Sequence, residues 1–268
     1  LKNEEWTVAK HIESDNESDR FGHSISLSSD GTVLAVGAMY GETTDSSGTS
    51  ADNSGYVNVY KYGETTEKNP NNGEWGQVQS SITGIGMIDT LQSGILYNPW
   101  YVNPNSDEFG FSVDISSDGL RWAISSASGG YVSVFGKVHG GWDYEGRDYG
   151  KYWHQVGETI NFFDSSSDIQ PESIRNQESV VQVKMSEDGK YIAIGSPNVD
   201  VGGTNNGLIR VYKFDTDWVQ VGSDIVGQNL SHLGSFIDIE EDSNGFLTLA
   251  ASGTKENGES YVNIYKLF

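Results

Sequence analysis

The residues best suited to hold an ion are carboxylates grouped in two loops. Asp15, Glu17 and Asp19 alternate along one loop, and Asp164 and Asp168 begin and end a short serine-rich stretch. Carboxylate oxygens are hard ligands, and Ca²⁺ takes about six to eight such ligands. Because no EF-hand loop accompanies these acids, two interpretations stay open, a Ca²⁺ site and a solvated acidic loop.

An aromatic loop offers a second candidate site. Residues 95–104 contain Tyr97, Trp100 and Tyr101 among Asn and Pro, and Tyr40 lies in another long loop. Such a loop is suited to stack on a sugar or a peptide. The alternative is that Trp100 fills the mouth of a narrow central channel.

Patterns typical of catalysis are scarce. The chain has neither a Gly-x-Ser-x-Gly elbow nor a P-loop. Acids are so numerous that no single pair stands out as the two carboxylates of a glycosidase. The five histidines show no metal-binding spacing; they are His11, His23, His139, His154 and His232.

Composition narrows the class of partner. The formal net charge is −22 over 268 residues, so the surface repels nucleic acid and anionic membranes and favours cations or basic partners, or serves solubility alone. No apolar run approaches the roughly 18 residues of a membrane span. Without cysteine there is no disulfide framework. The chain begins at Leu1 with no signal peptide, which indicates a mature product or a domain excised from a larger polypeptide.

The elements that must position these loops are repeated strands. A strand and tight turn with the pattern Phe-Gly-x-Ser…Ser-x-Asp-Gly occupies residues 109–119 and 21–31, and weaker copies occupy 181–189 and 233–245. The Asp-Gly pair predicts a hairpin, because glycine tolerates the positive φ of such turns. Four copies of one unit indicate a repeat fold.

Three further strands complete each repeat. A nearly continuous apolar run follows each turn, as at 32–38, and is typical of a strand buried on both faces. The next strand, as at 55–62, alternates apolar and polar residues, which predicts one wet face. The last strand carries a tryptophan, usually followed by Gln-Val, as in Trp218, Gln220 and Val221.

The order of these strands predicts a closed ring. The chain opens with a last-type strand at 5–12, and its final repeat lacks that strand. We therefore expect a single all-β domain over residues 1–268, a four-bladed β-propeller of four-stranded antiparallel blades. The N-terminal strand would pair into the last blade and close the ring. The blades are predicted at about 21–82, 109–160 and 179–225, and at 233–268 together with 5–12.

The pattern Trp-x-Gln-Val-Gly…Phe-Gly-x-Ser-Val-x-x-Ser-x-Asp-Gly…Gly-x-Val-x-Val-Tyr resembles the FG-GAP/WD40-like propeller repeats of extracellular and surface proteins. The resemblance covers essentially the whole chain and departs at Ser179 and Val180, which replace Phe-Gly. It implies the fold and an extracellular or cell-surface location, but propellers host many unrelated functions. The integrin-type calcium loop is absent, so the resemblance does not supply a metal site.

The predicted loops sort unequally by charge. Applying the propeller rule, the loops on one face hold 17 Asp and Glu against three Lys and Arg. Variable loops on a rigid scaffold commonly carry function. We therefore expect a non-catalytic module that presents this acidic face to a protein, a glycan or a cation. The first alternative is a carbohydrate-active enzyme, a glycoside hydrolase or lyase. The second is a purely structural domain of a larger surface protein.

Overall fold

The regular structure of the described residues is entirely β-strand. The computed structural model describes residues 5–14, 16–44, 50–51, 53–63, 73–78, 80–84, 107–136, 153–162 and 182–267. The strands of these residues pair antiparallel in four larger sheets and one short ribbon. In this part of the chain, no helix has the length and apolar character needed to cross a membrane. The all-β prediction is confirmed.

Each larger sheet corresponds to one sequence repeat. Sheet 1 contains β1 (Phe21–Leu27), β2 (Val33–Ala38), β5 (Tyr56–Tyr62), β6 (Trp75–Gln77) and β7 (Ile82–Thr83). Sheet 2 contains β8 (Phe109–Ile115), β9 (Arg121–Ser126), β10 (Tyr131–Gly136), β11 (His154–Gln155) and β12 (Ile160–Asn161). Sheet 3 contains β13 (Gln182–Met185), β14 (Tyr191–Ser196), β15 (Leu208–Phe214) and β16 (Trp218–Val226). Sheet 4 contains β17 (Ile237–Glu241), β18 (Leu247–Thr254) and β19 (Ser260–Leu267), and the ribbon pairs β3 (Thr43–Thr44) with β4 (Ser50–Ala51).

The repeated serine and aspartate build the first turn of each sheet. In sheet 2 the Ser116 hydroxyl donates to Asp118 at 2.6 Å, and Asp118 accepts the Leu120 backbone N–H at 2.9 Å. Gly119 then adopts φ +70°, where a side chain would be strained. Sheets 1 and 3 repeat the contacts between Ser28 and Asp30 and between Ser186 and Asp188. The turn prediction is confirmed, and these acids cap turns.

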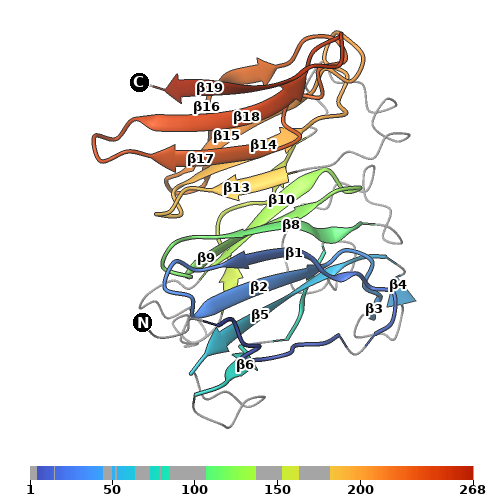
Figure 1. Cartoon of the computed structure of the whole chain (residues 1–268), viewed down its shortest axis with the longest axis vertical. Helices are drawn as coiled ribbons and strands as arrows, with labels where there is room; N and C mark the ends of the chain where they lie inside the picture. Colours follow the sequence, from blue (N-terminus) through green and yellow to red (C-terminus); the bar gives the residue numbers. More distant parts are fainter. Residues whose placement is uncertain are drawn as a thin grey trace.

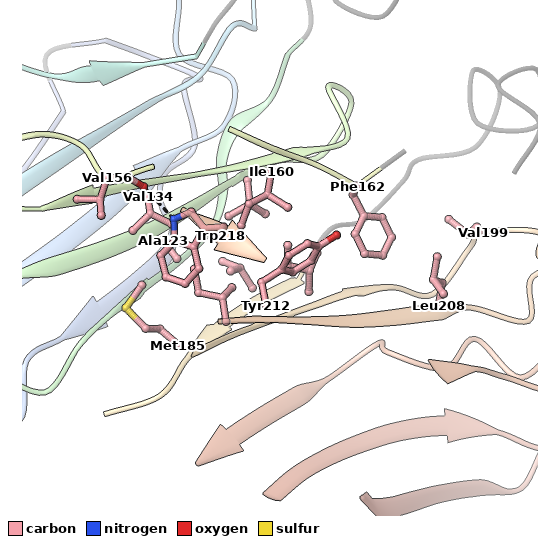
Figure 2. Close-up of a cluster of buried hydrophobic side chains, with 14 residues drawn as sticks. Ala123, Val134, Val156, Ile160, Phe162, Met185, Val199, Leu208, Tyr212 and Trp218 are labelled. Atoms are coloured by element: carbon pink, nitrogen blue, oxygen red, sulfur yellow. Dashed lines mark hydrogen bonds between the residues drawn. The ribbon is translucent and has the colours of Figure 1, made fainter. Parts of the chain in front are cut away.

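The sheets stack face to face in a row (Figure 1). Three apolar cores lie between successive sheets. The core between sheets 2 and 3 contains Val134, Met185 and Trp218 (Figure 2). There the Trp218 indole N–H donates to the Val156 carbonyl oxygen at 2.8 Å, which joins the outer strands of the two sheets. Each sheet therefore buries both faces only where it has a neighbour on each side.

Glycines allow the sheets to approach closely. A Cβ added to Gly37 would lie 2.1 Å from the carbonyl oxygen of Gly110 in the next sheet, and one added to Gly195 would lie 2.6 Å from that of Gly234. Both positions belong to the buried second strand of their sheets. The repeated Phe-Gly or Leu-Gly of one sheet thus packs directly on the backbone of the sheet before it.

The third strand is more deeply buried than its alternating pattern predicts. In β10 and β15 the polar residues Ser133 and Arg210 are only 2% and 8% exposed. Arg210 pairs with Asp224 at 2.8 Å and donates to the Phe162 carbonyl oxygen at 2.5 Å. The prediction of one wet face is wrong for these strands, because a neighbouring sheet covers that face and internal partners satisfy its polar groups.

The predicted ring closure is not observed. Residues 5–14 form no strand, and β19 pairs with β18 alone among the described residues. Sheets 1 and 4 lie at opposite ends of the long axis (Figure 1), so the N-terminal segment lies away from the strand it was predicted to join. Lys10 instead pairs with Glu74 of sheet 1 at 3.7 Å.

Substituting Gly37 with Ala will destabilise the protein by about 1 to 3 kcal/mol, because the new methyl group forces sheets 1 and 2 apart. Urea unfolding followed by tryptophan fluorescence measures the change. Gly203→Ala is the matched control, since the nearest atom to its Cβ would be the side-chain oxygen of Asn229, at 3.2 Å. Equal stability of the two variants would contradict the close-approach argument.

Candidate functional site

The first strands of the sheets form an open cavity. β1, β8 and β13 follow one another along the row of sheets (Figure 1), and a cavity of about 430 Å³ opens across them. Its lining mixes basic, polar and apolar side chains from the three strands. The lining residues are His23, Ser24, Ile25, Phe111, Ser112, Val113, Gln182 and Lys184.

A buried carboxylate ties the three strands together beside this cavity. Asp114 of β8 is 8% exposed. It accepts the Ser26 hydroxyl from β1 and the Met185 backbone N–H from β13, each at 2.9 Å. Its Oδ1 also lies 3.4 Å from the Lys184 ammonium. Asp114 therefore fixes where the cavity's positive charge sits, and internal donors satisfy the carboxylate in return.

The imidazole of His23 is the cavity's titratable base. Its ring lies 5.0 Å from the Phe111 ring, centroid to centroid, with the planes tilted by 56°. Partial burial lowers the pKa of His23 below 6.5, and the positive charge of Arg20 lowers it further. The imidazole is therefore mostly neutral at pH 7 and able to accept a proton.

These groups define what the cavity can do chemically. A neutral imidazole can act as a general base, and an ammonium can stabilise negative charge that develops on an oxygen. The Phe111 ring offers an apolar surface of the kind that packs on a sugar or another ring. No carboxylate is among the described lining residues, whereas a glycosidase uses two.

Most of the sequence-predicted site residues lie outside the described part of the chain. The predictions of an aromatic platform and of a Ca²⁺ site therefore stay predictions for these positions. They are Tyr97, Trp100, Tyr101, Asp15, Asp164 and Asp168.

The remaining predicted site residues do not come together at the cavity. Glu17 lies exposed in a turn. Asp19 is 4% exposed, accepts the Phe21 backbone N–H at 2.9 Å, and accepts the hydroxyl groups of Ser14 and Tyr56. The Tyr40 ring lies under the Arg20 guanidinium, 4.4 Å from its centroid. Among the described residues, no cluster of three His, Cys, Asp or Glu side chains is arranged to hold a metal.

A buried Asp–Tyr pair repeats in sheets 1 and 2, and sequence reasoning missed it. Asp107 corresponds to Asp19, and Tyr131 to Tyr56. The Tyr131 hydroxyl donates to Asp107 at 2.5 Å, and the Ser126 hydroxyl donates at 2.7 Å. Burial raises the pKa of Asp107 to about 6, and burial with the Asp19 bond raises that of Tyr56 to about 12. An acid two residues before each Phe-Gly, matched by a Tyr at the start of the third strand, was the available signal.

The cavity residues were also missed, although the repeats held a signal for them. His23 and Phe111 occupy one aligned position of the first strand, and Ser24, Ser112 and Gln182 occupy the next. Positions that vary between repeats while their neighbours stay constant indicate a shared surface. The sequence does not show that three such strands meet.

Comparisons with known proteins give fold-level similarity only. No family model matches the chain, and neither does any curated protein. The chain is similar to the periplasmic gluconolactonase PpgL of Pseudomonas aeruginosa (14% identity, TM-score 0.43, 91% of this chain and 57% of that one). It is also similar to a candidate 6-phosphogluconolactonase of Bacteroides fragilis (10%, 0.44, 92% and 56%) and to the α-L-arabinofuranosidase PaAbf62A of Podospora anserina (11%, 0.41, 95% and 66%). The chain thus spans under two thirds of the length of each of these structures.

The comparisons contradict the prediction that this chain is a non-catalytic binding module. The matched structures are propeller-type folds, and the three above are named for enzymatic activities. The prediction of a non-catalytic binding module, more likely no enzyme, is therefore contradicted, and the enzyme alternative is the better supported of the two. With these identities and TM-scores, any activity of this chain has to be argued from its own residues.

Replacing Asp107 with Asn will change how stability depends on pH. Between about pH 4 and pH 6 the unfolded chain loses this proton before the folded protein does, so the wild type loses stability as pH rises through this window. A shift from 3.8 to about 6 corresponds to roughly 3 kcal/mol. The amide carries no such penalty, so the stability of the variant relative to wild type should rise by about that amount from pH 4 to pH 7.

Urea unfolding at pH 4, 5, 6 and 7 measures this difference. Asp30→Asn is the control, because hydrogen bonds from Ser28 and Thr32 lower the pKa of that exposed acid, in the direction opposite to the shift at Asp107. A wild-type-to-Asp107→Asn difference that stays constant with pH would rule out a raised pKa at Asp107.

Proposed function

We propose that this chain is a carbohydrate-active hydrolase that hydrolyses the ester or lactone bond of a sugar derivative. The active site is the cavity across β1, β8 and β13. The observation that carries the proposal is the pairing of a neutral imidazole, His23, with an anchored ammonium, Lys184, in one lining.

The proposed reaction gives a role to each of His23, Lys184 and Phe111. His23 accepts a proton from a water molecule as the water oxygen attacks the carbonyl carbon. The Lys184 ammonium stabilises the negative charge that develops on the carbonyl oxygen. As the tetrahedral intermediate collapses, the C–O bond to the sugar breaks and imidazolium returns the proton to the departing alkoxide. The Phe111 ring supports the sugar ring from one side.

Charge supports a neutral substrate for this site. With a formal net charge of −22, the protein disfavours the approach of polyanions. A neutral sugar ester or lactone is not repelled by this net charge, and its reaction develops a single negative charge beside Lys184. A glycosidic bond is a poorer match, since its cleavage needs two carboxylates and the described lining contains none.

We propose, for the fold, that the four sheets are propeller blades of the FG-GAP/WD40-like repeat type. The glycine contacts support this assignment, because Gly37 and Gly55 of sheet 1 approach the backbone of sheet 2 at Phe109-Gly110, the Phe-Gly of the repeat. In this arrangement the cavity lies on the inner strands of the blades, on the side of a propeller axis.

Substitutions in the cavity test the proposed reaction. Hydrolysis of a panel of neutral sugar esters and aldonolactones should fall by about 10²- to 10⁴-fold in kcat/KM for His23→Gln. Lys184→Met should lower kcat by about 10²- to 10³-fold. Removing a nearby positive charge in Arg20→Gln should raise the pKa of His23, and the acidic limb of the kcat/KM profile should move to higher pH.

His11→Gln is the matched control, because His11 is exposed and lies outside the cavity lining. It should hydrolyse the same substrates at the wild-type rate. An inactive wild type across the whole panel would favour the structural-domain alternative, and full activity in His23→Gln would remove the imidazole from the mechanism.

A further inference from the structure

Each internal interface of the row uses the same positions on both sides. One side is the third strand of a sheet, where two apolar residues lie on either side of a central polar residue. These apolar pairs are Val57 and Val59 in sheet 1, Val132 and Val134 in sheet 2, and Ile209 and Val211 in sheet 3. These six side chains are at most 8% exposed. The other side is the first strand of the next sheet, for example Val113 and Ile115, which are 5% and 7% exposed.

The two end sheets carry these same positions uncovered. In sheet 4 the third-strand pair is Val262 and Ile264, which are 65% and 62% exposed. In sheet 1 the first-strand pair is Ile25 and Leu27, which are 67% and 54% exposed. One end of the row therefore presents half of the repeated interface, and the other end presents the complementary half.

The edge of sheet 4 is incomplete in a matching way. β15 pairs with β16, a tryptophan-containing strand that comes just before the next sheet in sequence. β19 has no such partner among the described residues. The segment of that type which precedes sheet 1, residues 5–12, holds Trp6 and Val8 at 104% and 88% exposure. If the outer face of sheet 4 were covered by a sheet 1, residues 5–12 that precede that sheet 1 could lie beside β19.

We propose that a second copy of this chain covers these faces, with sheet 1 of each copy packed on sheet 4 of the other. Sheets 1 and 4 lie at opposite ends of the long axis (Figure 1), so packing one end face on the other within one chain would require the three packed internal interfaces to bend. Close-packed interfaces resist such bending. A second copy repeats an interface that the chain already forms three times.

Two such contacts close the assembly. A head-to-tail contact is heterologous, and it ends only when the last copy meets the first. In the proposed dimer, two identical contacts join eight sheets in one ring, and residues 5–12 of each copy lie beside β19 of the other. This interaction surface goes beyond the proposed hydrolase function. Of the four end-face residues named above, Ile25 is the one that also belongs to the described lining of the cavity.

The test uses one charged substitution at each end of the whole chain. Leu27→Lys blocks the sheet 1 face, and Ile264→Lys blocks the sheet 4 face. Sedimentation should show the wild type as a dimer, while either variant alone should dissociate at least about tenfold more readily, because every contact then buries an unpaired charge. An equimolar mixture of the two variants should recover a heterodimer, because one contact remains intact.

Val219→Lys is the matched control for a lysine placed on an exposed strand position. Val219 is 60% exposed, on β16 outside both end faces, and this variant should dimerise as the wild type does. Recovery of the heterodimer also shows that each variant is folded. A wild type that sediments as a monomer would overturn the proposal, whether or not the monomer brings its own sheets 1 and 4 together. So would a mixture of the two variants that stays monomeric.

Discussion

The close backbone approach between neighbouring sheets is the constraint on which the rest of the structure depends. A Cβ on Gly55 would lie 2.1 Å from the Phe109 carbonyl oxygen, and one on Gly207 would lie 2.2 Å from that of Leu233. Both glycines also have positive φ. At these points the backbone of one sheet occupies the space of a missing side chain in the sheet before it. This spacing allows the apolar side chains on either side to interdigitate at interior density.

That spacing places the first strands within hydrogen-bonding distance of each other. Asp114 reaches both β1 and β13 only because the two strands flank β8 closely enough for Ser26 and Met185 to donate to one carboxylate. The same strands carry His23 and Lys184 into one cavity. Loosening the inter-sheet contact would separate the base from the ammonium, so the proposed chemistry depends on packing far from the reacting groups.

Burial on both faces forces the polar residues of the sheets into internal partnerships. Arg210, Asp107 and Ser133 lie in the interior, and an unsatisfied polar group there costs free energy comparable to a lost hydrogen bond or more. Each has a partner within its own sheet: Arg210 bonds Asp224, Asp107 bonds Tyr131, and Ser133 bonds Thr159. In β10 and β15, the polar residues that predicted a wet face form internal hydrogen bonds instead.

The sequence by itself determined the features that local interactions specify. The Ser-x-Asp-Gly turns could be predicted because a serine, an aspartate and a positive-φ glycine satisfy one another within five residues. The apolar second strands could be predicted from their runs of apolar residues alone, and each copy of the repeated unit matches one of the larger sheets. The same local evidence gave the wrong exposure for the polar residues of β10 and β15, because the residues that cover them come from another repeat, as Phe162 of sheet 2 does for Arg210.

Only the tertiary structure decided which distant residues share a site. His23, Phe111 and Lys184 come from three repeats, and each looks like an ordinary strand residue in its own segment. Their meeting depends on the stacking of whole sheets, an energy summed over many side chains and carried by no short motif. The uncovered ends were decided in the same way. The sequence shows that residues 5–12 and β19 are complementary in kind, and the positions of sheets 1 and 4 determine whether one chain can bring them together.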